Sequence, residues 1–161
     1  MAAEPLRIDG ASAESVRDAL ERAGWASGRV LRACVLRQGH SPTMTGAILL
    51  YGLIRLFFSP GSKALPRIFV LAATSERVLA FRARGGVGGE GYRVTVYPGE
   101  EASWAREAVT MEAAKAGITM NAVLSVPGDG GAESIRCTAP NSQLEPAVEE
   151  MLALLGAPEP S

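Results

Sequence analysis

The sequence predicts one domain of the α+β class, with helices at both ends of a strand-rich middle. The chain has 161 residues, close to the common size of a single domain and enough to bury a sizeable core. Apolar residues make up 47% and charged residues 20%, as in ordinary globular proteins and unlike disordered chains. Two stretches have helical periodicity and several others alternate like strands, so both element types are expected.

The first part of the chain predicts a helix followed by a short strand. Residues 1–10 have no period and are expected to be flexible, as chain ends usually are. From Ser12 to Gly24 apolar residues recur at i, i+3, i+4 and i+7, which indicates an amphipathic helix capped by Ser12 and ended by Gly24. Residues 30–37 (VLRACVLR) lie between glycines and are predicted to be a strand.

Residues 43–58 (TMTGAILLYGLIRLFF) are the most apolar stretch of the chain. Wound as a helix, the stretch is apolar nearly all round, and such a helix is either buried or in lipid. A bilayer span needs about 20 apolar residues, whereas this run meets Arg55, so a true span is least favoured. Packing within the domain or an oligomer is favoured over reversible insertion in a membrane interface. The candidate contact residues are Leu49, Leu50, Leu53, Ile54, Leu56, Phe57 and Phe58.

Beyond the turn signal at 59–61, the pattern changes to strands. Residues 67–74 and 77–84 are joined by Ser75-Glu76 and predict a tight hairpin. The second run is apolar on both faces, as expected of a central or barrel strand.

Three more strands follow in the pattern. Residues 92–97 (YRVTVY) alternate cleanly and are expected to end at Pro98-Gly99. Residues 118–126 and 132–138 predict a second hairpin across a Pro-Gly-Asp-Gly-Gly turn.

A C-terminal helix is predicted over 142–155. Its apolar residues form one stripe, and Val148, Met151, Leu152 and Leu155 are expected to bury against the sheet. Ser142 and Glu145 have the spacing of a capping box, although Pro146 shifts the expected start to about Glu145.

The stretch 101–116 leaves two interpretations open. Its Ala, Glu, Met, Arg and Lys residues favour a helix by propensity. The alternation that begins at Ala105 would also suit a strand.

The residues with reactive side chains predict no catalytic, cofactor or metal site. His40 is the only histidine, has no nucleophile or metal-ligand pattern around it, and is expected in an exposed loop. Gly86-x-Gly88-x-x-Gly91 matches a dinucleotide fingerprint, but a predicted strand follows it where phosphate binding needs a helix N-terminus. We therefore interpret 85–91 as a flexible, dispensable hairpin loop and expect neither an enzyme nor a cofactor.

The cysteines, the tryptophans, the N-terminal sequence and the charge give further expectations about the core, the cellular location and the partners. Cys34 and Cys137 are expected to be buried reduced thiols rather than a disulfide, and Trp25 and Trp104 to anchor a core. The N-terminus lacks signal-peptide order, so the predicted location is cytoplasmic, with peripheral membrane association as an option. The net charge of −1, without a local Lys/Arg cluster, argues against nucleic acid as a partner.

The stretch 65–81 (LPRIFVLAATSERVLAF) resembles small PH-like proteins that are common in actinobacteria, in which such a hairpin begins a strand-rich half. The similarity extends more loosely through Trp104-Ala-Arg106 and the hairpin at 118–137 to the closing helix. The resemblance implies a curved antiparallel sheet or partial barrel plugged by the C-terminal helix. It also implies that 109–116 is a strand and that the protein binds rather than catalyses.

The expected organisation is a flexible N-terminus (1–10), a helical region packed on or beside the domain (11–62), and a PH-like sheet with its helix (63–157). The leading hypothesis is a non-enzymatic binding or scaffold module that contacts a protein, including a second copy, or a membrane surface. The alternatives are a small-ligand carrier or enzyme with a sheet-lined pocket, and a subunit of a homo-oligomer. These patterns assign no small-molecule ligand, and fold by itself does not carry function.

Overall fold

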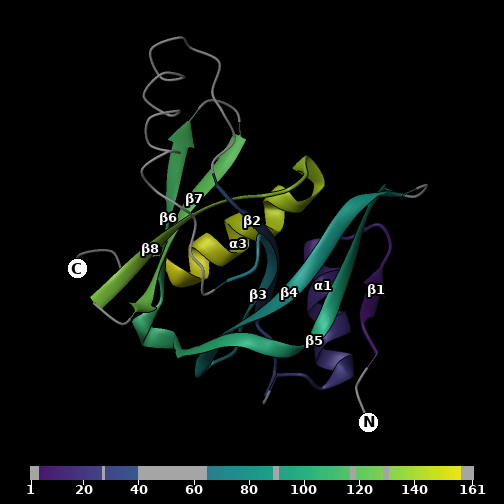
Figure 1. The fold of residues 1–161 in the computed structure, drawn as a ribbon, viewed down its shortest axis with the longest axis horizontal. Coiled ribbons are helices and arrows are strands. Elements are labelled where there is room, and N and C mark those ends of the chain that lie inside the picture. Colours follow the sequence, from purple (N-terminus) through teal and green to yellow (C-terminus); the bar gives the residue numbers. More distant parts are fainter. Residues whose placement is uncertain are drawn as a thin grey trace.

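The computed structural model describes residues 4–26, 28–39, 65–88, 91–116, 119–128 and 131–156. The predicted apolar segment and His40 lie outside these ranges. Within them, one curled antiparallel sheet has the strand order β1-β5-β4-β3-β2-β8-β7-β6, as Figure 1 shows. Its strands are β1 (Leu6–Ile8), β2 (Arg32–Gln38), β3 (Ile68–Ala73), β4 (Arg77–Gly88), β5 (Gly91–Ala105), β6 (Thr110–Ala116), β7 (Thr119–Gly128) and β8 (Gly131–Thr138).

The two α-helices of the described residues pack on opposite faces of this sheet. The helix α3 (Glu145–Leu155) lies inside the curl, between the β6–β7–β8 side and the β2–β3–β4 side, whereas α1 (Ala13–Ala23) lies outside it next to β1 and β2. The sheet includes β1, from the end that was expected to be flexible, and β2, which confirms the strand predicted at 30–37. The expected curved antiparallel sheet with a C-terminal helix is confirmed.

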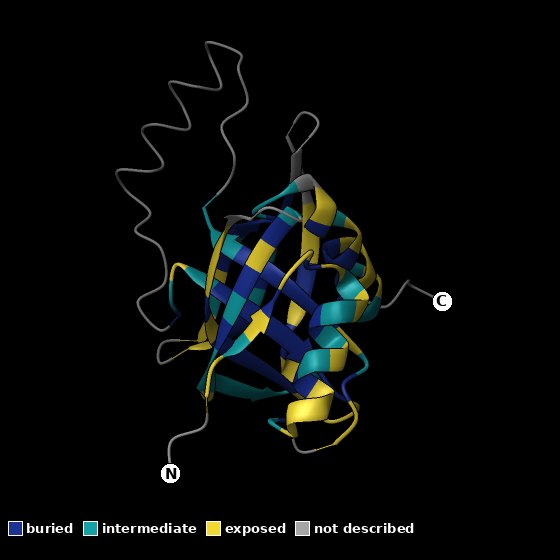
Figure 2. Ribbon diagram, turned by 90° about the vertical axis from the view of Figure 1, so that its right-hand side faces the viewer, coloured by how far each residue is buried: buried dark blue, intermediate teal, exposed yellow. Residues whose placement is uncertain are grey.

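The sheet separates two hydrophobic cores. The inner core joins α3 to β2, β3, β4, β6, β7 and β8, and the outer core joins α1 to β1, β2, β3, β4 and β5. In β4, Val78 and Ala80 point into the inner core while Leu79 and Phe81 point into the outer core. Both faces of this strand are therefore buried, as predicted, and Figure 2 shows the buried residues running through the middle of the sheet.

The ends of α1 and the start of α3 at Glu145 agree with the sequence, but the predicted cap of α3 does not form. Ser12 Oγ accepts the backbone N–H of Ser15 at 3.2 Å, and Gly24 ends α1 in the left-handed conformation with φ of 69°. The predicted capping box of Ser142 and Glu145 is wrong, because 142–144 forms the 3-10 turn η2 (Ser142–Leu144) and α3 begins at Glu145 without a side-chain cap. Pro146 explains this start, since proline is tolerated only in the first turn of a helix.

The strand predicted to end at Pro98-Gly99 continues through these residues. Register irregularities in the β4–β5 ladder around Phe81 absorb extra residues of β5, and Gly99 has a φ of 89° that suits glycine. The sequence expectation of a stop was wrong because a bulge lets a Pro-Gly pair stay within a strand.

The open question at 101–116 is settled in favour of strands. After β5 come the 3-10 turn η1 (Arg106–Ala108) and then β6, so the helix favoured by propensity is wrong and the strand implied by the resemblance is confirmed. Pairing with β7 and the burial of Met111 in the inner core outweigh the helical propensity.

The end of β2 and the residues just before β3 lie next to each other, so the connection between the two strands begins and ends at the same place on the sheet. Gln38 Nε2 donates to the carbonyl oxygens of Leu65 at 2.8 Å and Pro66 at 3.1 Å. The backbone N–H of Gln38 also donates to the carbonyl of Arg67 at 2.8 Å. Gln38 thus holds together the two ends of the connection that contains the predicted apolar segment.

The packing of α3 predicts that alanine substitutions along its apolar stripe lower the free energy of unfolding by different amounts. Val148, Met151 and Leu155 are buried as expected, but Leu152 is only partly buried. Met151→Ala should lower the free energy of unfolding by about 2–5 kcal/mol, because it leaves a cavity in the inner core. Leu152→Ala should cost less. Urea denaturation of both variants measures the difference, and equal losses would contradict this packing.

Candidate functional site

Among the described residues, those singled out for chemistry are not brought together into an active site. Gly86, Gly88 and Gly91 lie at the end of the β4–β5 hairpin and are followed by strand β5. No helix N-terminus follows them to hold a phosphate. The expectation of a flexible loop over 85–91 is wrong for residues 85–88, which belong to β4, and for Gly91, which begins β5.

The two cysteines are both in the inner core with free thiols. Burial raises the pKa of the Cys137 thiol to about 12. Burial, and secondarily the nearby Cys137, also raises the pKa of Cys34. Because the thiolate is the reactive form, these residues are inert in the folded chain.

Titratable and aromatic side chains give no other reactive cluster in the described part of the chain. No group of three or more His, Cys, Asp or Glu residues there could hold a metal ion. Trp25 and Trp104 are each partly buried against a core, with the Trp25 ring 5.8 Å from that of Phe81. Both tryptophans therefore help to hold the fold.

Two surface hollows in the described part of the chain are lined by other residues. One, of about 350 Å³, is lined mostly by Ala, Gly and Pro with the hydroxyls of Thr110 and Ser125 on the β6–β7–β8 side. The other, of about 240 Å³, lies between α1, α3 and β2 and is lined by two arginines and two glutamates, Arg17, Arg32, Glu14 and Glu150, with Ala13 and Ala33. Neither combines a deep apolar wall with convergent polar groups, as small-molecule sites usually do.

The most distinctive surface is an exposed group of arginines on β1, β4 and β5. In the ladders Arg7 pairs with Thr95, and Thr95 pairs with Arg84, so the three side chains form one row across three strands. Neighbouring strands lie about 4.8 Å apart, which puts the two arginine Cα atoms about 10 Å from each other. The three residues point away from the outer core, since their neighbours Ile8, Val94 and Ala83 fill it.

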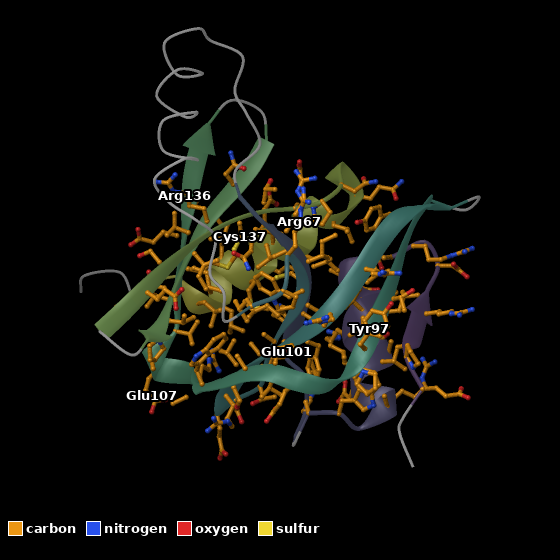
Figure 3. All side chains as sticks on the ribbon, in the orientation of Figure 1. Arg67, Tyr97, Glu101, Glu107, Arg136 and Cys137 are labelled. Carbon is orange, nitrogen blue, oxygen red and sulfur yellow. The ribbon has the colours of Figure 1, made fainter. Side chains whose placement is uncertain are left out.

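Further polar residues extend the row on both sides. Arg93 and Tyr97 alternate with Thr95 on the same face of β5, Arg82 alternates with Arg84 on β4, and the exposed Arg67 directly precedes β3. We call the set of Arg7, Arg67, Arg82, Arg84, Arg93, Thr95 and Tyr97 the arginine face. Figure 3 labels Arg67 and Tyr97 of this set, together with Glu101.

Carboxylates neutralise part of the arginine face. Arg82 Nε lies 3.3 Å from Glu101 Oε1, with 60% of the arginine side chain exposed. Arg93 forms an ion pair with Asp9, which follows β1. Arg7, Arg67 and Arg84 make no side-chain ion pair or hydrogen bond with any described residue. These three cationic groups are therefore exposed on one side of the sheet without a partner among the described residues.

Sequence reasoning missed this face because its arginines are dispersed along the chain, which has no local cluster. The available signal was the alternation itself: Arg82 and Arg84 in one predicted strand, and Arg93, Thr95 and Tyr97 in another, occupy the polar side. Strand pairing was needed to place those two sides next to each other.

The hairpin glycines predict a sharp contrast between two neighbours. A Cβ on Gly85 would lie 1.8 Å from Tyr92 Oη and 2.4 Å from its Cζ, whereas a Cβ on Gly86 would meet nothing within 4 Å. Gly85→Ala should therefore cost about 1–3 kcal/mol, because the buried Tyr92 ring must move. Gly86→Ala should leave the thermal midpoint nearly unchanged. Similar midpoints for the two variants would show that the ring does not cover Gly85.

The buried thiols predict how reactivity and stability depend on conditions. A thiol reagent such as Ellman's reagent should label neither cysteine of the native chain at pH 8, and both in urea. Unfolded thiols ionise near their ordinary pKa of 9.0 while the folded ones stay protonated. The free energy of unfolding should therefore fall as the pH rises above about 9. Rapid labelling of the native chain would contradict the burial.

Neither α1 nor α3, at 11 residues each, has the length and apolarity that crossing a bilayer requires.

Comparison with known proteins identifies no family for the chain. No protein-family model matches the chain, and no curated protein matches it either.

Proposed function

We propose that the chain is a non-enzymatic binding module, built on a PH-like scaffold, that docks an anionic surface of a partner on its arginine face. The observation that carries this proposal is the set of three exposed arginines, Arg7, Arg67 and Arg84, without a carboxylate partner among the described residues. Fixed charges on a rigid surface steer and orient a partner of opposite charge.

The rest of the described structure supports docking over chemistry. The inner side of the curled sheet, which a ligand carrier would use as its pocket, is filled by α3 and its hydrophobic neighbours. The two cysteines are the strongest nucleophiles described, and their raised pKa values keep them protonated.

The arginine face also lies beside the base of the predicted apolar segment. Arg67 follows Leu65 and Pro66, whose carbonyls bind Gln38 where the chain re-enters the sheet. Contacts through residues 43–58 stay a separate prediction, and the arginine face does not depend on them.

Site-specific photo-crosslinking in cells of the source organism tests the proposal. A photoreactive amino acid is placed at Thr95, in the middle of the arginine face, or at Ser134, an exposed residue of β8. We expect an adduct from position 95 that disappears in the Arg7→Gln/Arg84→Gln variant, and none from position 134. Adducts that do not depend on the two arginines would contradict the proposal. An adduct of twice the chain mass would identify a second copy as the partner.

A further inference from the structure

We infer that the arginine face binds an acidic segment of a partner protein through that segment's carboxylate side chains, an inference that rests on the proposed function. The juxtaposition that carries it is the Arg7–Thr95–Arg84 row flanked by two arginines that already hold carboxylates.

The first step is that this surface already binds carboxylates within the chain. Asp9 pairs with Arg93, which adjoins Thr95 on the same side of β5, and Glu101 pairs with Arg82, which adjoins Arg84 on β4. Both pairs are exposed, and such pairs are weak and exchange readily. The carboxylates show which anion the guanidinium groups accept, and a partner's carboxylates would meet the same donors.

The second step is the geometry of the Arg7–Thr95–Arg84 row. Arg7 and Arg84 stand about 10 Å apart across two strand spacings, with the Thr95 hydroxyl between them. Each planar guanidinium can donate two parallel hydrogen bonds to one carboxylate. The Thr95 hydroxyl can donate to a backbone carbonyl of the partner segment. This carbonyl would lie between the two residues whose carboxylates bind the arginines. An extended or helical chain with spaced acidic residues supplies this pattern.

The third step is the absence of large exposed aliphatic side chains from the described part of the face. Proteins that lie on a membrane usually bury apolar side chains below the headgroups. The arginine face has Arg, Thr and one half-buried Tyr, together with Gly86 on β4. Arginine and tyrosine are enriched in protein–protein interfaces. These residues favour an acidic protein over an anionic bilayer.

The binding experiment uses the full chain and probes of defined chemistry. A fluorescent peptide of alternating Glu and Ser is titrated by anisotropy, and the same peptide with Gln for Glu is the charge control. Vesicles of phosphatidylcholine with and without phosphatidylglycerol are titrated in parallel. Circular dichroism confirms that each variant is folded.

Removing two arginines should weaken binding of the Glu peptide. Arg7→Gln/Arg84→Gln should raise its Kd about tenfold, since each exposed pair is worth up to about a fivefold factor. The matched control Arg106→Gln/Arg136→Gln removes the same charge on η1 and β8 and should change the Kd less than about twofold.

Removing a carboxylate that pairs with an arginine of this face should strengthen binding of the Glu peptide. Asp9→Asn frees Arg93 and should tighten peptide binding by about two- to fivefold. The control Glu107→Gln makes the same charge change at an exposed residue of η1. This control should not tighten peptide binding. Equal effects of the two variants would overturn the argument from internal carboxylates.

The remaining outcomes separate the inference from the proposed function. Arginine-dependent binding to phosphatidylglycerol vesicles without binding to the Glu peptide would overturn the acidic-protein partner and leave docking of an anionic surface in place. Binding that is insensitive to Arg7→Gln/Arg84→Gln with every probe would overturn both. Binding of the Gln peptide as tightly as the Glu peptide would also overturn the inference.

Discussion

The structure depends on the burial of β2, β3 and β4 on both of their faces. In β2, Cys34 and Leu36 belong to the inner core while Ala33 and Val35 belong to the outer core. Successive strand residues point to opposite sides, so a slip of one residue would exchange the contents of the two cores. The different sets of side chains in the two cores therefore hold the register, and α1 and α3 each cover one face.

Burial on both faces also decides where polar side chains can stand. The middle of the sheet admits almost only apolar or small residues, since an unpaired polar group buried there is costly. Charged side chains appear where the strands run beyond their covering helices, as in the outer part of the β4–β5 hairpin. The arginine face occupies such a region: its back is fixed by the outer core, and its front is free of described helices.

Short sequence patterns correctly predicted the elements that are determined by neighbouring residues. The caps of α1 are set by Ser12 and Gly24, and the 67–84 hairpin by two apolar runs with a short turn, so each could be read from a few neighbouring residues. The stretch 101–116 could not, because pairing with β7 and packing of Met111 overrode its helical propensity. The arginine face could not be assembled either, because it requires the register of the β4–β5 hairpin and its pairing with β1, which is distant in sequence.

The three-residue strand β1 makes one side of the arginine face the least secure. Arg7 is placed by a ladder that spans only Leu6–Ile8, continued by the Ala11 N–H bond of 2.9 Å to the Tyr92 carbonyl. Arg84 instead stands on β4, a strand of 12 residues whose ladder with β5 continues on both sides of Arg84 and which also pairs with β3 at 78–82. Short terminal strands open at much lower free energy than central ones. Amide hydrogen exchange should therefore be graded across the surface, and fraying of β1 would remove Arg7 and Asp9 together while the rest of the sheet stays folded.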